Sequence, residues 1–388
     1  MTLNNKSKKT ILYLVTQSEL GGAQTYVFDL VTSLQLEYNV VIGSGEQGHK
    51  GELAKMLKET NTDFYTVPYL QRKISPWHDF MALFQIIKLI KKIKPDIIHL
   101  NSSKISILGS LAVGIIRGYS FKNSRPIRVI YTVHGWVFNE PMSSLKRLFY
   151  QYAEKITALF KDKLICVSQF DYDLACQYKI APQRKLVMIH NGIKEVKFLS
   201  REEARVKLNV DNEKFVIGSI GNLYKNKGFK YLIEATKELV ANNSQLTTII
   251  IGEGQGRNNL EKLIKEYNLE NNIILAGRIE NASELLLAFD IYVCSSVKEG
   301  LSYTIIEAMQ SGLPIVATNV GGNPELIKDQ ETGFLIKPND PGILASKINE
   351  IINNPDLMQE QSTKARIKAL EEFNLETMIK KTKAVYLD

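Results

Sequence analysis

Short runs rich in β-branched residues alternate with helical patterns along the whole chain of 388 residues, and this alternation most constrains the fold. Strands that are separated by helices pair in parallel, so the sequence predicts a layered α/β architecture. In the first half, strands are predicted at residues 10–15, 39–42, 63–67, 96–100, 128–133 and 163–167. Helices are predicted between them at 23–36, 52–58, 78–92, 104–116 and 145–160.

The same pattern starts again in the second half. A strand at 214–220, a glycine-flanked loop and a helix at 229–240 repeat the order of the chain start, and strands follow at 246–251, 272–276, 291–294 and 314–318. We therefore predict two tandem Rossmann-like, doubly wound domains that face each other across a cleft. The first is acceptor-side (1–194) and the second binds the nucleotide (195–372), while the last helix within 373–388 either packs on the second or crosses back to the first. Ligands of such sheets bind beyond the carboxyl ends of the strands.

The composition excludes several classes of protein. The chain is 44% hydrophobic and 23% charged, which is typical of a folded globular protein. Its three cysteines, Cys166, Cys176 and Cys294, lie in apolar stretches, and we interpret them as reduced core thiols. The apolar run at 11–15 is too short for a signal peptide, and the run at 105–116 is well short of the ~20 residues of a spanning helix. We expect a cytoplasmic protein.

The positive charge is concentrated in the first half. The net charge is +8, but residues 1–195 hold 26 basic and 15 acidic residues, so an anionic ligand or surface is expected there. We find no nucleic-acid-binding motif and predict no nucleic-acid partner. Two amphipathic helices are candidates for contact with the anionic inner face of the cell membrane. Helix 145–160 is expected simply to cover the sheet, whereas helix 104–116 is the membrane candidate, because four basic residues follow it: Arg117, Lys122, Arg125 and Arg128.

The segment 298–309 carries the strongest chemical signal. A predicted strand leads into a loop with Glu299 and then into a helix from about Ser302 to Gln310. The start of a helix favours an anion such as phosphate, and the Glu307 carboxylate suits a pair of vicinal hydroxyls such as those of ribose. An ordinary structural interpretation remains equally open, in which Glu299 is a helix-start acid and Glu307 pairs with a buried lysine.

The spacing of Glu299 and Glu307 before a G-x-P-[IV]-V-A segment resembles the donor-site signature of family-4 retaining glycosyltransferases, which have the GT-B fold. The resemblance covers essentially the whole chain. It is carried jointly by these pieces, each weak when taken alone: Gly21-Gly22-Ala23-Gln24, Thr132-Val133-His134-Gly135, Val167-Ser168, Asn191-Gly192-Ile193, Gly221-Asn222-Leu223, Lys227-Gly228, Ile251-Gly252-Glu253-Gly254, Gly277-Arg278, 295–300, 311–318 and 321–326.

The resemblance implies roles for individual residues. Glu307 would hold the donor ribose, Glu299 a hydroxyl of the donor sugar, and Lys227 the diphosphate. The remaining implied positions are the amides near Leu301 and Ser302 at the helix start, Arg278 on the donor, His134 beside the donor sugar, and Gly21 and Gly22 where backbone approaches phosphate or acceptor. His134, Lys227 and Glu299 would be the catalytic residues.

One position departs from the family pattern, and one motif imitates a metal site. Asn222 stands where the family usually has arginine, so either Lys225 compensates or the leaving group is held less tightly. Asp171-Tyr172-Asp173 imitates a metal-binding D-x-D motif, but it lies in a helical pattern, and we interpret it as exposed helix charge. A lysine and a helix N-terminus supply positive charge without metal, so no metal or other cofactor is expected.

The sequence therefore predicts a retaining, metal-independent hexosyltransferase that uses a nucleotide-diphosphate sugar, with UDP favoured as the nucleotide. The acceptor would be a glycan or lipid-linked sugar in surface-polysaccharide synthesis. Three rivals remain: a GT-B sugar-nucleotide epimerase, a nicotinamide-dependent oxidoreductase and a catalytically silent partner subunit. The oxidoreductase hypothesis is disfavoured because the second predicted strand ends in Val41-Ile42-Gly43-Ser44 and lacks the acidic residue that binds ribose in such enzymes.

Overall fold

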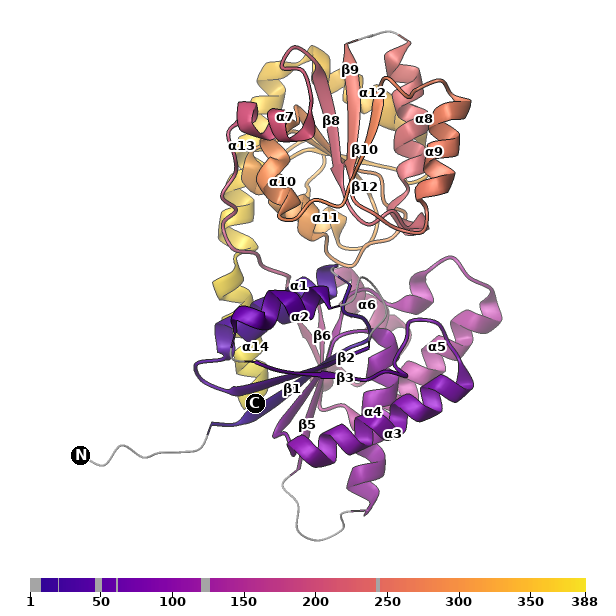
Figure 1. The fold of residues 1–388 in the computed structure, drawn as a ribbon, viewed down its shortest axis with the longest axis vertical. Coiled ribbons are helices and arrows are strands. Elements are labelled where there is room, and N and C mark those ends of the chain that lie inside the picture. Colours follow the sequence, from indigo (N-terminus) through magenta and orange to yellow (C-terminus); the bar gives the residue numbers. More distant parts are fainter. Residues whose placement is uncertain (1–7, 20, 46–50, 61, 120–125, 242–244) are drawn as a thin grey trace, which may run out of the picture. The chain divides into compact units, whose positions relative to one another are not determined.

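The computed structural model describes residues 8–19, 21–45, 51–60, 62–119, 126–241 and 245–388. Within them the chain divides into two compact units, each with its own parallel sheet. Unit 1 is Met1–His190 together with Met378–Asp388, and unit 2 is Asn191–Thr377. The last helix thus begins in unit 2 and ends in unit 1. The predicted α/β class with two doubly wound sheets is confirmed (Figure 1).

Unit 1 contains a seven-stranded sheet in the order β3-β2-β1-β4-β5-β6-β7. Its strands are β1 (Thr10–Val15), β2 (Asn39–Ser44), β3 (Asp63–Thr66), β4 (Ile97–Leu100), β5 (Arg128–Val133), β6 (Lys163–Cys166) and β7 (Leu186–Met188). Its helices are α1 (Gly22–Leu34), α2 (Glu52–Met56), α3 (Pro76–Ile93), α4 (Ser103–Tyr119), α5 (Ser144–Thr157), α6 (Gln169–Gln177) and the end of α14 (Leu375–Leu387).

Unit 2 contains a six-stranded sheet in the order β10-β9-β8-β11-β12-β13. Its strands are β8 (Phe215–Ile220), β9 (Leu246–Ile251), β10 (Ile273–Gly277), β11 (Ile291–Cys294), β12 (Ile315–Thr318) and β13 (Phe334–Ile336). Its helices are α7 (Arg201–Leu208), α8 (Phe229–Val240), α9 (Arg257–Glu266), α10 (Tyr303–Ser311), α11 (Asn323–Leu326), α12 (Pro341–Asn353) and α13 (Pro355–Glu372).

Alternation along the strands of unit 1 gives the sheet two different faces. Leu12 and Leu14 of β1 belong to a fully buried apolar core with Ile86 of α3 and Ile105 of α4. The residue between them, Tyr13, points to the opposite face. In Figure 1, α3, α4 and α5 lie on the same side of the sheet.

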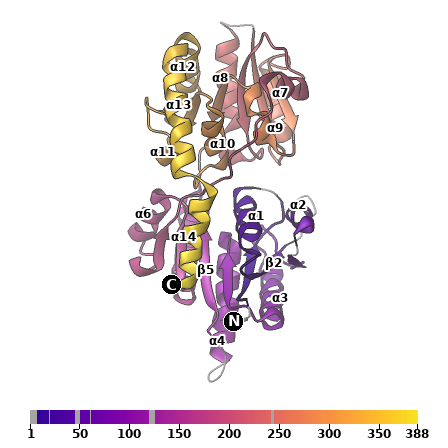
Figure 2. The ribbon, with the colours of Figure 1, turned by 90° about the vertical axis from the view of Figure 1, so that its left-hand side faces the viewer.

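The end of α14 binds to the second face of this sheet through buried polar groups. The Tyr386 hydroxyl lies 2.6 Å from His99 Nδ1 and 2.9 Å from the Tyr13 hydroxyl, and His99 Nε2 lies 2.7 Å from Thr132 Oγ1. Burial lowers the pKa of His99 to about 3, so its imidazole is neutral near pH 7. His99 is therefore a packed structural residue. Figure 2 shows the end of α14 running beside the sheet of unit 1, near β5.

The membrane candidate predicted from the sequence, α4, packs against the apolar core of unit 1. Ile105, Leu108, Ala112 and Val113 of α4 are buried in that core, whereas Ile115, at 39% exposure, faces outward. Arg117 is held by the carbonyls of Ile127 and Phe160 and by Asp162, and Lys122 and Arg125 lie outside the described residues. None of the helices in the described part of the chain has the length and apolarity to cross a bilayer.

One further expectation needs correction. Asp171 is 1% exposed rather than an exposed charge: its carboxylate accepts from the Ser168 hydroxyl at 2.9 Å and from the Trp136 amide at 3.3 Å. Its partner in the apparent D-x-D motif, Asp173, is exposed. Of the three cysteines, Cys166 and Cys294 are buried and Cys176 is half-buried, and all three are free thiols.

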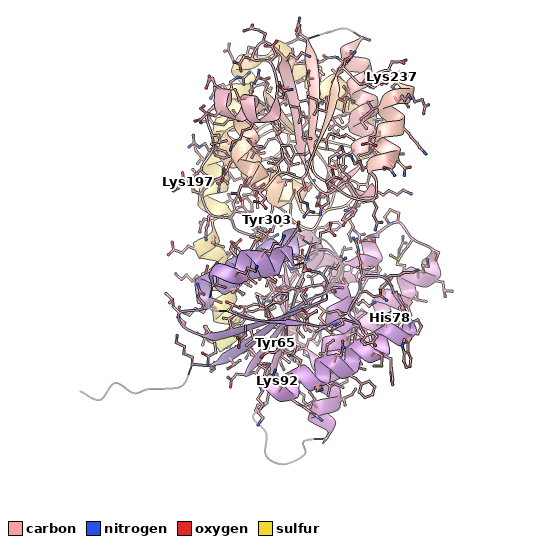
Figure 3. The ribbon with its side chains drawn as sticks, in the orientation of Figure 1. Tyr65, His78, Lys92, Lys197, Lys237 and Tyr303 are labelled. Atoms are coloured by element: carbon pink, nitrogen blue, oxygen red, sulfur yellow. The ribbon has the colours of Figure 1, made fainter. Side chains whose placement is uncertain are left out.

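Replacing Tyr386 tests the polar attachment of α14. Tyr386→Phe keeps the ring but removes the partner of Tyr13 and of His99 Nδ1, and each buried group left unpaired costs about 1–3 kcal/mol. We expect the free energy of unfolding, measured by urea denaturation, to fall by at least that amount. Tyr65→Phe is the control, because half-buried Tyr65 meets Lys92 through its ring, which the substitution keeps (Figure 3). Equal stability of both variants would contradict the assigned role.

Candidate functional site

The candidate donor site of unit 2 lies where the strand order reverses. From β8 the chain proceeds to β9 on one side, and β11 returns on the other side of β8. The loops that follow β8 and β11 therefore leave the same sheet edge side by side, at the position where open α/β sheets bind ligands. Lys227 comes from the first loop and Glu299 from the second.

Lys227 and Glu299 form an ion pair across this position. The distance from Lys227 Nζ to Glu299 Oε1 is 2.7 Å, and the two side chains are only 22% and 10% exposed. The Ser296 hydroxyl donates to the same carboxylate oxygen at 2.5 Å. Lys227 is therefore not a solvated loop lysine. Ser296 was not predicted as a site residue, although it lies just beyond the carboxyl end of β11, where ligand-binding residues are expected.

The ion pair fixes the protonation state of Lys227. Burial alone would lower its pKa, but attraction to Glu299, the nearby Cys294 and the hydrogen bond to Glu299 outweigh burial and raise it above its ordinary value. The ammonium group is thus fully charged near neutral pH. It provides a fixed positive charge at the reversal point of the sheet.

The two loops are held together by backbone contacts that require glycine. Gly228 has φ +64°, and a Cβ there would stand 2.1 Å from the Ser295 carbonyl oxygen. The Ser295 hydroxyl donates to the Lys227 carbonyl at 3.1 Å, and the Val297 amide donates to the Asn226 carbonyl at 2.8 Å. These bonds set the backbone from which Lys227 and Glu299 project.

Helix α10 begins directly after this loop. Ser302 is its N-cap and accepts from the Ile305 amide at 3.4 Å, so Ser302 and not Glu299 caps the helix. The carbonyl of Leu301 accepts from the Asn191 side chain at 3.1 Å, which ties the loop to the start of unit 2. Asn191 belongs to the segment Asn191-Gly192-Ile193, which resembles the family pattern, but no role was predicted for its side chain. The first amides of α10 and the dipole of the helix face the loop.

Glu307 lies in the middle of α10 and is half-buried. Burial raises the pKa of the Tyr292 phenol well above its usual range, and Cys294 and Glu307 raise it further, which places the Glu307 carboxylate in the electrostatic environment of Tyr292. Tyr292 lies on β11, and its hydroxyl is 3.5 Å from the carbonyl of Ile220, at the end of β8. Glu307 thus lies on the helix that follows the Glu299 loop, beyond the Ser302 N-cap.

The other residues predicted to bind the donor follow two different strands, β8 and β10. Asn222 follows β8 directly and is half-buried, and Lys225 is exposed. Arg278 follows edge strand β10, which is separated from β8 by β9. The structure thus brings Lys227, Glu299 and the start of α10 together and leaves Arg278 at the carboxyl end of a strand farther out.

Unit 1 holds the remaining predicted residues at its own reversal point. Gly21 caps α1 after β1, with Gly22 beside it, and His134 follows β5, one strand beyond β4. The His134 ring lies edge-on to Tyr26 with a centroid distance of 4.9 Å, and burial lowers its pKa to about 3. Among the described residues His134 Nε2 is buried without a hydrogen-bond partner, so a neutral imidazole is available at this sheet edge.

The sheet edge of unit 1 also contains polar residues that the sequence reasoning missed. The Thr16 hydroxyl, after β1, lies 2.5 Å from that of Ser102, after β4. Asn101, also after β4, is fully buried and donates to the carbonyl of His99 at 3.0 Å. Their position directly after strand ends is the signal that could have found them.

Two family models match consecutive parts of the chain. "Glycosyltransferase Family 4" matches residues 20–196, and "Glycosyl transferases group 1" matches residues 200–368.

Similar proteins match over nearly the full length. An Escherichia coli UDP-Gal:alpha-D-GlcNAc-diphosphoundecaprenol alpha-1,3-galactosyltransferase is 30% identical over 394 residues, covering 98% of this chain and 97% of that protein. The Staphylococcus aureus capsular polysaccharide biosynthesis glycosyltransferase CapM is 25% identical, covering 97% and 96%. The crystal structure of Anabaena HepE in complex with UDP and glucose superimposes with a TM-score of 0.82 at 22% identity, covering 97% and 98%. The chain belongs to the family-4 glycosyltransferases with the GT-B fold.

Proposed function

We propose that the protein transfers a hexose-type sugar from UDP, with retention of anomeric configuration and without a metal ion, to a lipid-linked or glycan acceptor of a surface polysaccharide. The carrying observation is the Lys227–Glu299 pair beside the N-terminus of α10. A departing nucleoside diphosphate develops negative charge, and a preorganised cation beside helix amides stabilises that charge. The named activity of the E. coli relative supports the choice of donor and acceptor.

The individual roles follow from the positions. Lys227 would bind the diphosphate, the amides near Leu301 and Ser302 would add hydrogen bonds, and Glu307 would accept from the ribose hydroxyls. Glu299 would bind a hydroxyl of the sugar while it orients Lys227. Attack from the face of the leaving group, with the diphosphate accepting the proton of the acceptor, gives retention without a covalent enzyme intermediate.

His134 and the glycines after β1 would serve the acceptor side. A neutral imidazole can donate or accept a hydrogen bond but brings no charge, which suits contact with sugar hydroxyls. Gly21 and Gly22 have no side chain to block a ligand at the start of α1. We place Asn222 and Arg278 at the outer part of the donor site, with Asn222 as a neutral hydrogen-bond donor where the family pattern implies arginine.

The proposed function is tested by donor binding and product analysis. Calorimetry with UDP, GDP and ADP should show that UDP binds most tightly, with the same affinity in EDTA as in Mg²⁺. Incubation with UDP-galactose and a short-chain N-acetylglucosaminyl diphospholipid should release UDP and give an α-linked product by NMR. A β-linked product, or reversible loss of activity in EDTA, would refute retention or metal independence. Conversion of the donor sugar without an acceptor would favour the epimerase.

Glu307→Ala should weaken nucleotide binding. The substitution removes both acceptors for the ribose hydroxyls, and hydrogen bonds to charged groups contribute about 1.5–3 kcal/mol. Calorimetry with UDP should show that loss in affinity, whereas Glu238→Ala, at an exposed position of α8, should bind normally. A folded Glu307→Ala protein with unchanged UDP affinity would remove Glu307 from the site.

Lys227→Ala should lower kcat by ~10²–10³-fold, as expected when a preorganised charge at a developing anion is lost. Lys230→Ala is the matched control, because Lys230 is an exposed lysine three residues along the chain whose ammonium contacts the Tyr231 ring. Initial rates of UDP release report on both variants. Normal turnover of Lys227→Ala would mean that the start of α10 alone stabilises the leaving diphosphate.

A further inference from the structure

Helix α5 has its polar side inside and its apolar side outside. Five of its large apolar or aromatic residues, and one just beyond its end, are between 48% and 79% exposed: Leu145, Leu148, Phe149, Tyr152, Ile156 and Leu159. Their spacing of three and four residues puts them on one stripe of the helix. Single exposed apolar residues are ordinary, but a continuous stripe marks an interaction site. The expectation that this stripe covers the sheet is therefore wrong.

The inward side of α5 is fixed by a buried ion pair. Glu154 is 2% exposed, and its carboxylate accepts from Lys161 Nζ at 2.8 Å and from the Ser106 hydroxyl of α4 at 3.2 Å. The same ammonium donates to the Thr157 hydroxyl at 2.9 Å. Rotating α5 to bury its apolar stripe would break this ion pair and leave both charges without a partner. The orientation with the apolar stripe facing outward is therefore stable.

A second exposed aromatic stripe lies on α3. Trp77, Phe80 and Phe84 are each more than half exposed and form consecutive ring contacts, with centroids 6.4 Å and 4.8 Å apart. Both helices pack on the same end of α4. Lys104 of α4 pairs with Asp79 of α3 at 2.5 Å, and two residues later Ser106 contacts α5. The two stripes therefore belong to one region of unit 1.

The charges around these stripes favour an anionic bilayer over a second copy of the protein as the binding partner. Lys146 and Arg147 are exposed on α5, Lys155 stacks on the Tyr152 ring at 5.4 Å, and Lys88 and Lys91 are exposed on α3. The acids of these two helices, Asp79 and Glu154, are both engaged in ion pairs. A second copy of the same surface would bring like charges together, whereas an anionic bilayer complements them. Aromatic and leucine residues beside lysine and arginine are typical of helices that lie in the membrane interface.

We propose that the outward stripes of α5 and α3 form a docking surface for an anionic lipid bilayer. The apolar side chains enter the headgroup region and the basic residues contact lipid phosphates. This inference goes beyond the proposed transfer reaction, because it rests on exposure and charge in unit 1 alone.

The test is co-sedimentation of the full chain with vesicles of phosphatidylcholine alone or with 30% phosphatidylglycerol, at low and high salt. We expect binding to the anionic vesicles at low salt and weaker binding at high salt. Lys146→Gln, Arg147→Gln and Lys155→Gln together should reduce partitioning by roughly 100-fold, since each basic residue near an anionic bilayer contributes about fivefold. The control replaces three exposed lysines of unit 2 by glutamine: Lys207, Lys262 and Lys265.

The apolar contribution is tested by Leu148→Ser, Phe149→Ser and Ile156→Ser together, which should also abolish vesicle binding. Val206→Ser with Ile367→Ser, two exposed apolar positions of unit 2, should leave it unchanged. Circular dichroism and UDP affinity should match wild type in every variant. Equal, negligible binding of the wild type to both vesicles would overturn the proposal. So would a dimer in light scattering that the serine variant converts to a monomer without any lipid dependence.

Discussion

Parallel pairing makes all strands of a sheet end at the same edge, and the candidate chemistry of this protein depends on that constraint. A ligand-binding crevice forms at this edge where the strand order reverses. The reversal lies between β8 and β11 in unit 2 and between β1 and β4 in unit 1. Lys227 and Glu299 lie at the first of these positions. The seven strands of unit 1 and the six of unit 2 thus serve to present two short loop clusters with fixed backbones.

The electrostatics of the pair follow from this placement. Loop backbones that bond to each other leave Lys227 and Glu299 little freedom, so the ammonium is held 2.7 Å from its carboxylate. A diphosphate that engages Lys227 competes with Glu299 for the same protons. Binding the donor would therefore release part of the Glu299 carboxylate for other hydrogen bonds. A sugar hydroxyl is a suitable recipient, so diphosphate binding and sugar recognition would be coupled through one lysine.

Periodicity predicted much of the fold because β1, β5, β8 and β9 are buried on both faces and are rich in apolar and β-branched residues. The rule that ligands lie after strand ends led to Lys227, Glu299 and Glu307. Short β13, with three residues, carries too few positions for a recognisable pattern.

The orientation of helices could not be predicted in this way. Helical spacing shows that α5 has two faces, but not which one turns inward. That choice depends on Lys161, whose burial against Glu154 is a tertiary effect and raises no signal in the local sequence. In the same way, α4 is apolar enough for a membrane surface but is covered by its neighbours, and Asp171 is buried because Trp136 and Ser168 bind it.

The attachment of α14 changes what counts as a separable module. The last eleven residues belong with the first 190, since Tyr386 bonds to Tyr13 and His99. A hybrid enzyme made by joining two relatives at a single junction near residue 190 would combine one parent's sheet with the other parent's closing helix. Recombination between relatives is therefore expected to yield active hybrids when the crossover is double and the C-terminal segment travels with its own N-terminal unit. Exchange of whole units between relatives thus requires two breakpoints, not one.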